Sequence, residues 1–141
     1  MKKESYESSM KFINYFVENI EFKNNLNFEE GEVSIDFDVS PEFLKGDDER
    51  DLIVVLDVSV FKDAVQHNYP FEMNVRMVGF FRVEDENNEV DKFKPNAVAI
   101  MYPYIRAIVT NYTANANVNP LILPVININA LIRDKMKNKE E

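Results

Sequence analysis

The sequence predicts an α+β fold, in which a four-stranded antiparallel sheet is followed by a long kinked helix and a short C-terminal helix. Two patterns predict it. Apolar and polar residues alternate in four segments between residues 10 and 84, which is typical of half-buried strands. The longest apolar region comes later, from Asn96 to Leu131, and its first half has helical spacing. With 141 residues, 45% of them apolar, the chain has the length and composition of one globular domain, expected to span residues 1–141.

The first two predicted strands are Lys11–Lys23 and Glu32–Val39. Alternation in the first strand places four apolar side chains on one side, namely Phe12, Phe16, Ile20 and Phe22. In the second strand, apolar residues alternate with the polar residues Glu32, Ser34, Asp36 and Asp38. This pattern indicates a strand with one solvated face.

A loop is predicted at Ser40–Arg50, because the segment contains Pro41, Gly46 and an acidic run. It also holds an apolar pair, Phe43 and Leu44. In a loop this pair has less reason to be buried, so a binding role is as plausible as a packing role.

Two further strands follow. The third, Leu52–Phe61, is rich in β-branched residues, and its start is apolar on both sides. After a turn at Lys62–Asn68, the fourth strand covers Tyr69–Glu84. Gly79 inside this strand indicates a bulge or the close approach of another backbone.

The long helix is predicted at residues 96–114. One face is apolar and consists of Val98, Met101, Ile105, Ile108, Val109 and Tyr112. The opposite face is hardly more polar, with Ala97, Ile100, Tyr104 and Ala107. Few residues are then left to meet water, mainly Arg106, Thr110, Asn111 and Thr113. Both faces need covering, so we expect a second subunit on one of them. Pro103 lacks the N–H that a helix needs, which predicts a kink.

The end of the chain contains a connection and a second helix. Asparagines at residues 115–119 end the first helix, and Pro120–Pro124 encloses an extended apolar segment. Either Asn127 or Asn129 can cap a short helix at residues 128–138.

Composition excludes several classes of function. There is no cysteine, which excludes disulfides and thiolate chemistry. The net charge of -9 disfavours nucleic acids and anionic membranes. It is consistent with basic or mixed-charge partners and equally with a charge that serves solubility alone. We expect a reducing cytoplasm, because no signal peptide or apolar membrane span is evident.

Candidate catalytic groups are few. His67 is the only histidine and lies in a polar turn without a nucleophile motif. Asp36 and Asp38 could bind a divalent cation or a small ligand, or serve acid–base chemistry, but a solvated strand face is the favoured interpretation. No glycine loop of the kind that holds phosphates is present, and no cofactor is expected. The sequence therefore favours binding over catalysis.

The order of elements and two motifs resemble the SecB family of protein-export chaperones. The family's helix motif, an aromatic residue followed by P-Y-x-R, is similar to Tyr102–Arg106. Its connector motif, an L-x-L flanked by prolines and followed by a branched residue and N-F-D-A-L, is similar to Pro120–Leu131. Here Ile128 replaces the phenylalanine, and Asn129 stands at the usual acidic position.

The resemblance implies a homo-oligomer, a dimer of dimers in the family, with the long helices buried between the dimers. The interface residues on this reading are Val98, Met101, Tyr104, Ile105, Ile108 and Tyr112. It also implies an ATP-independent holdase that binds unfolded or nascent polypeptides in apolar grooves and delivers them for export. The groove residues would be Ile20, Phe22, Leu26, Phe28, Phe43, Leu44, Leu121, Ile122 and Leu123.

The resemblance further implies the motor protein SecA as a partner, docked partly on acidic residues of the first and fourth strands. The corresponding positions here are Asn19, Lys23 and Asn74, none of them acidic. The alternative is therefore a SecB-like protein dedicated to one partner, such as an antitoxin, without SecA docking.

Overall fold

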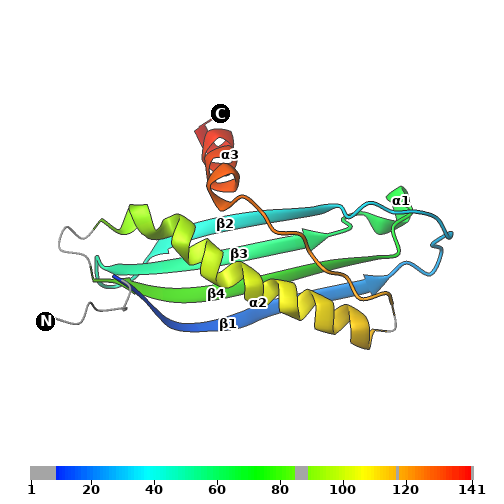
Figure 1. The fold of residues 1–141 in the computed structure, drawn as a ribbon, viewed down its shortest axis with the longest axis horizontal. Helices are drawn as coiled ribbons and strands as arrows, with labels where there is room; N and C mark the ends of the chain where they lie inside the picture. The colour runs from blue at the N-terminus through cyan, green and yellow to red at the C-terminus, as the bar shows by residue number, and fades with distance from the viewer. Residues whose placement is uncertain (1–8, 85–88, 117, 141) are drawn as a thin grey trace, which may run out of the picture.

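The computed structural model describes residues 9–84, 89–116 and 118–140. Four strands form one sheet, and a long helix and a C-terminal helix follow them (Figure 1). In chain order the elements are β1 (Met10–Asn24), β2 (Phe37–Lys45), β3 (Asp51–Val60), the short helix α1 (Ala64–His67), β4 (Phe71–Val83), the 3-10 turn η1 (Val90–Phe93), α2 (Lys94–Asn115) and α3 (Ile128–Glu140). The predicted α+β fold is confirmed.

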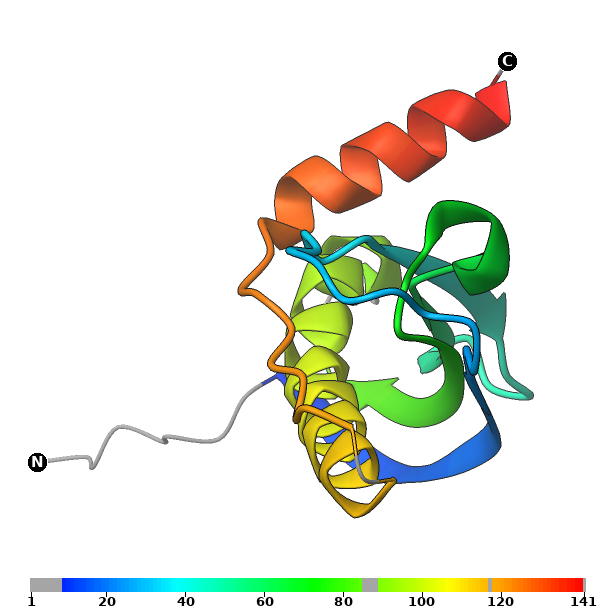
Figure 2. The ribbon, with the colours of Figure 1, turned by 90° about the vertical axis from the view of Figure 1, so that its right-hand side faces the viewer.

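The sheet is antiparallel throughout, with strand order β1-β4-β3-β2. Helix α2 lies along one face of the sheet, which we call the inner face; the opposite face is the outer face (Figure 2). None of the helices in the described ranges is long and apolar enough to cross a membrane.

The core lies between the two central strands and α2. Strands β3 and β4 alternate as predicted and bury every second side chain on the inner face, including Leu56, Val58, Val75 and Met77. Helix α2 meets them with Val98, Met101, Ile105 and Val109, all fully buried. The apolar stripe predicted for the long helix therefore faces the sheet of its own subunit.

The second strand is not where the sequence analysis placed it. Strand β2 covers Phe37–Lys45. The predicted strand Glu32–Val39 is therefore wrong before Phe37, and the predicted loop Ser40–Arg50 is wrong up to Lys45 and correct only for residues 46–50. Pro41 misled the prediction: it pairs with Leu56 inside β2. Proline is tolerated because β2 is an edge strand, where a missing N–H can point away from the ladder. Phe43 and Leu44 are thus strand residues.

Strand β1 alternates less simply than predicted. Its pairing with β4 shifts register twice, between Phe12 and Asn14 and between Val17 and Asn19. Each extra residue reverses the faces that follow it. Phe12 stacks on Phe81, which lies on the inner face, whereas Phe16 contacts Phe80 on the outer face. The prediction that Phe16 shares a side with Phe12 is wrong.

Gly79 is a site of close approach, although not by a backbone. A Cβ atom at this position would lie 2.8 Å from the sulfur of Met101 on α2. Strand β4 stays in continuous register with β3 at this point. The glycine therefore lets α2 lie close to the sheet.

Both helices begin and end near the predicted residues. Pro103 lies inside α2, and the kink there stays a prediction. Asn127 caps α3, because its side-chain oxygen accepts the backbone N–H of Ala130 at 3.0 Å.

Candidate functional site

The connector between α2 and α3, residues 118–127, is attached to α2 through its backbone. Three side chains spaced four residues apart on α2 donate hydrogen bonds to connector carbonyls. They join Tyr102 Oη to Pro124 (2.6 Å), Arg106 Nε to Leu123 (2.8 Å) and Thr110 Oγ1 to Leu121 (2.7 Å). The connector therefore runs antiparallel to the helix. Burial raises the pKa of Tyr102, against the opposing charge of Arg106, so the phenol stays protonated and can donate.

Thr113 completes this attachment one turn further along α2. Its fully buried hydroxyl accepts the backbone N–H of Leu121 at 3.0 Å and lies 2.8 Å from the carbonyl of Val109. The prediction that Arg106, Thr110, Asn111 and Thr113 face water is wrong for Thr113, which is fully buried, whereas Arg106 and Thr110 are half-buried and Asn111 is exposed. Arg106, Thr110 and Thr113 bind the connector.

The attachment determines which connector side chains are available to a ligand. Leu123 is fully buried in the core and Leu121 is half-buried. Between and beyond them, Ile122 is 67% exposed and Val125 is 83% exposed. Of the three connector residues predicted to bind, Ile122 is therefore the most accessible.

A second segment, the crossover loop of residues 25–36, leads from β1 to β2. It is fastened to the turn around α1 at both ends. Buried Asn25 donates to the carbonyls of Ala64 and Tyr69, at 3.3 and 2.9 Å. At the other end, Asp36 accepts a hydrogen bond from the Tyr69 hydroxyl at 3.1 Å. This interaction raises the pKa of Tyr69.

A row of five aromatic rings links α2 to the crossover loop. We call it the aromatic row; in spatial order it consists of Tyr112, Phe22, Phe71, Phe61 and Tyr69. Successive ring centroids lie 4.9–5.2 Å apart. The row begins beside Thr113, which holds the connector, and ends at Tyr69, which binds the crossover loop. Phe61 and Phe71 are buried, whereas Tyr112 is exposed.

The crossover loop adds exposed apolar and acidic groups beside this row. Leu26 is 92% exposed, and Phe28 is half-buried. Glu29, Glu30 and Glu32 are exposed, and their carboxylates form no ion pair within the described residues. The loop therefore offers an apolar surface with negative charge.

The predicted groove residues do not all come together. Ile20 and Phe22 lie on the inner face of β1, near the crossover loop with its Leu26 and Phe28. Phe43 lies on the inner face of β2, where the Lys94 ammonium is 5.2 Å from its ring centroid. Leu44, as its neighbour in the strand, lies on the outer face and cannot line the same groove.

Sequence reasoning missed the central members of the aromatic row. Phe71 is not among the predicted groove residues. Phe61 and Tyr69 lie at the two ends of a turn, and Phe61, Asp63 and Asn68 have positive φ there. That turn brings Tyr69 back against Phe61. Bulky residues rarely adopt positive φ, so the sequence could not predict that the turn brings Tyr69 into contact with Phe61.

The predicted interface residues fall into two groups. Val98, Met101 and Ile105 are fully buried against the chain's own sheet. Tyr104 and Tyr112 are exposed and Ile108 is half-buried, so these three remain available at the surface of the subunit.

The two strand aspartates have separate structural partners. Asp36 binds Tyr69, whereas Asp38 accepts hydrogen bonds from Lys135 of α3 at 3.0 and 3.1 Å. Burial pushes the pKa of Asp38 upward, but the hydrogen bond and charge of Lys135 outweigh it and lower the pKa. Among the described residues, no group of three or more acidic or histidine side chains could hold a metal ion. His67 is exposed and lies against Tyr69.

Comparisons with known proteins agree with this architecture. Residues 5–139 match the family described as "Preprotein translocase subunit SecB". An uncharacterized protein of Methanocaldococcus jannaschii is 32% identical over 140 residues, covering 94% of this chain and 88% of the relative.

Two solved structures share the fold. A SecB-like chaperone of Mycobacterium tuberculosis, solved with a ChAD peptide from the HigA1 antitoxin, has a TM-score of 0.63 at 12% identity, covering 84% of this chain and 88% of its own. A protein of unknown function from Streptococcus agalactiae has a TM-score of 0.54 at 15% identity, covering 82% of this chain and 97% of its own.

Proposed function

The chain belongs to the SecB family, and on this premise we propose that it is an ATP-independent holdase that binds unfolded or nascent polypeptides. The aromatic row carries the proposal. Phe61 and Phe71 form its buried base, and Tyr112, Phe22 and Tyr69 reach the surface. The segments at its two ends carry exposed aliphatic side chains, Leu26 on one and Ile122 on the other. Exposed apolar groups gathered in this way are typical of sites that bind other chains.

The proposed client is an extended apolar segment that carries basic residues. Its apolar side chains would contact Tyr112, Phe22 and Ile122, while Glu29, Glu30 and Glu32 would attract its positive charges. The net charge of -9 favours the same clients at long range. Acidic segments would be repelled.

We further propose that a second subunit covers the exposed side of α2, where Ile100, Tyr104 and Ile108 lie. The edge of β1 adds Tyr15 and Val17, both exposed on the inner side of the strand. An unpaired strand with apolar side chains invites pairing with another chain. A dimer or a tetramer would satisfy this requirement, and the mass in solution distinguishes them.

The holdase proposal is tested with a slowly refolding client under aggregating conditions. Stoichiometric protein should suppress light scattering, and Ile122→Asp should weaken that suppression without changing the oligomer. Asn19→Asp is the matched control, because it adds the same charge on the outer face. If adding the wild-type protein left the light scattering of the client unchanged, the proposal would be refuted.

A second candidate is a dedicated partner protein. The structural neighbour from Mycobacterium tuberculosis was solved with an antitoxin peptide, which favours a role of this kind for SecB-like folds. Asn19, Lys23 and Asn74 are not acidic, and Asn74 donates to Asp57 and Ser59, so we do not expect SecA to dock there. One recurrent partner in pull-downs would favour this candidate; many unrelated clients would favour the general holdase.

A further inference from the structure

The outer face of the sheet is divided into an apolar and a polar half. The apolar half lies toward the β2–β3 turn, and we call it the outer patch; it consists of Ile13, Phe16, Leu44, Ile53 and Phe80. Ile13 is 59%, Phe16 46% and Leu44 43% exposed. The polar half carries Asp57 and Arg76, which form an ion pair at 3.1 Å. The long helix α2 lies on the other face and leaves the outer patch uncovered.

The outer patch borders a cavity of about 630 Å³. Ile13, Ile53 and Phe80 line it, together with residues of the β2–β3 turn. The cavity is large enough for several side chains of a bound peptide, since ligand pockets typically measure ~300–1,000 Å³.

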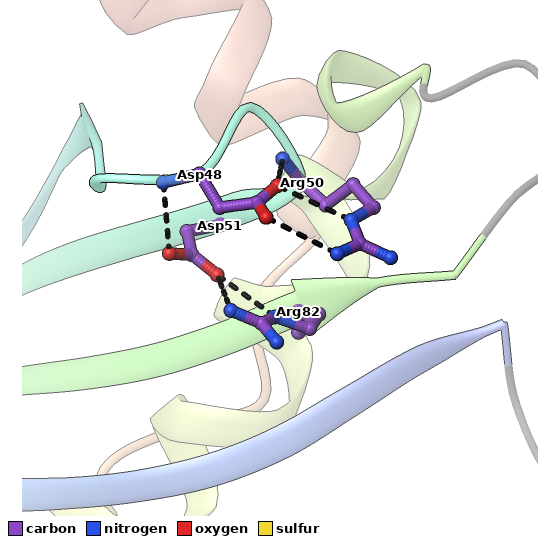
Figure 3. A network of polar contacts seen from close by, with 4 residues as sticks. All are labelled: Asp48, Arg50, Asp51 and Arg82. Carbon is purple, nitrogen blue, oxygen red and sulfur yellow. Dashed lines mark hydrogen bonds and ion pairs between the residues drawn. The ribbon is translucent and has the colours of Figure 1, made fainter.

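A network of ion pairs fixes the turn that forms the cavity's wall (Figure 3). Asp51 accepts the backbone N–H of Asp48 at 3.3 Å and the side chain of Arg82 at 3.0 Å. Asp48 in turn pairs with Arg50 at 3.1 Å. Hydrogen bonds from the Arg50 side chain and backbone lower the pKa of Asp48 to about 2, so the Asp48 carboxylate is charged at neutral pH. Gly46 is packed against Asp51, where a Cβ would lie 2.6 Å from the Asp51 Cβ.

The charges around the cavity cancel. The network pairs Asp48 with Arg50 and Asp51 with Arg82. The other charged groups that line the cavity are Lys45 and Asp47, opposite in sign, two residues apart and without an ion pair among the described residues. The cavity therefore has no net charge to attract a strongly charged ligand, whereas the crossover loop is acidic and attracts positive charge. An uncharged apolar segment matches both the apolar side chains that line the cavity and the balanced charges around it.

We infer that the outer patch is a second client-binding surface, which takes electrically neutral, extended apolar segments of an unfolded polypeptide. The inference rests on the proposed holdase function and adds a site on the face opposite the aromatic row. Strand β1 joins the two surfaces, because its register shifts expose apolar side chains on both faces, Tyr15 and Val17 inward and Ile13 and Phe16 outward.

The test uses a short uncharged apolar peptide, capped at both ends, titrated into the full chain by calorimetry. The double variant Ile13→Ser, Leu44→Ser should bind this peptide roughly tenfold more weakly, as expected when anchor side chains are truncated. Val65→Ser, which removes an exposed apolar side chain of α1 away from both surfaces, should leave its affinity unchanged.

Three results would overturn the inference. The first is an unchanged affinity of the double variant, or no binding by the wild-type protein. The second is a loss caused by Ile122→Asp but not by the double variant, which would place the neutral peptide at the inner site and leave the holdase function intact. The third is a lower mass in solution for the double variant than for the wild-type protein, which would show that the outer patch is a contact between copies of the chain. Failure of the holdase function itself appears separately, in the light-scattering assay.

Discussion

The guanidinium of Arg106 donates a hydrogen bond to the carbonyl oxygen of Leu123 at 2.8 Å, which ties the middle of α2 to the connector. The Leu123 side chain is fully buried directly beyond this bond. Arg106 thereby helps to set which connector residues face the core and which face the solvent.

Arg106→Met should destabilise the protein by about 1.5 kcal/mol, because it removes a charged donor from the Leu123 carbonyl but keeps the apolar stem. Urea unfolding measures the change. Arg133→Met on α3, where the arginine is exposed, is the control and should be nearly neutral. Equal stability of the two variants would contradict the proposed role of Arg106.

Thr113→Val should destabilise the protein by about 1 kcal/mol, since it leaves the partly buried backbone N–H of Leu121 without its acceptor. Thr113→Ser keeps the hydroxyl and should recover most of that loss. Thermal unfolding of the three proteins is the measurement. Equal unfolding temperatures of the valine and serine variants would show that the loss of stability does not come from the hydrogen bond.

Gly46→Ala should destabilise the protein by about 1–3 kcal/mol through overpacking against Asp51. The contact involves the Asp51 Cβ, which cannot move away without its backbone. Gly31→Ala is a matched control, because nothing lies within 4 Å of the added methyl group there. Its effect should be neutral or slightly stabilising, by up to about 1 kcal/mol, through the unfolded chain. An unchanged free energy of unfolding for Gly46→Ala would show that the turn can move to accommodate the methyl group.

The contact between Asp38 and Lys135 should make stability depend on pH. Because the folded pKa of Asp38 is lowered, its contribution is present above the unfolded value of about 3.9 and is lost as pH falls through the folded value. Lys135→Met should therefore be less stable at pH 7, by roughly 0.5 kcal/mol for so exposed a pair. Unfolding curves of both proteins should converge in strong acid. A difference that persists there would assign the loss to packing of α3 instead.

Leu26→Ser should weaken binding of an unfolded apolar client by roughly tenfold and leave stability unchanged, because this side chain is almost fully exposed. Fluorescence anisotropy of a labelled client measures the affinity. Asn27→Ser, at the neighbouring exposed position, should have no effect. Comparable losses in both variants would point to the loop backbone and not to the leucine.

Hydrophobic periodicity was sufficient for β3, β4 and the buried side of α2, because each of these elements buries one regular face. It failed for β1, whose two register shifts break the period of two without any change in composition. Pro41 was read as a loop residue because proline is excluded from central strands, and only the strand order reveals that β2 lies at an edge.

The candidate site was harder to predict for a different reason. Arg106, Thr110 and Thr113 are polar, and a polar residue on a helix is normally assigned to the solvent. Here their partners are backbone atoms of a segment without regular structure, which leaves no pattern in the sequence. The motif around Tyr102–Arg106 indicated the family, but its structural role required the coordinates.

The attachment of the connector also affects how binding preference can change through mutation. Helix α2 holds this segment by its backbone, so the hydrogen bonds tolerate replacement of the outward side chains at positions 122 and 125. On the proposed holdase function, substitutions there would alter which polypeptides are bound, while the inward leucines and the polar side chains of the helix preserve the fold. On the proposed function, the residues that hold the connector in place are thus distinct from the residues that would contact a client.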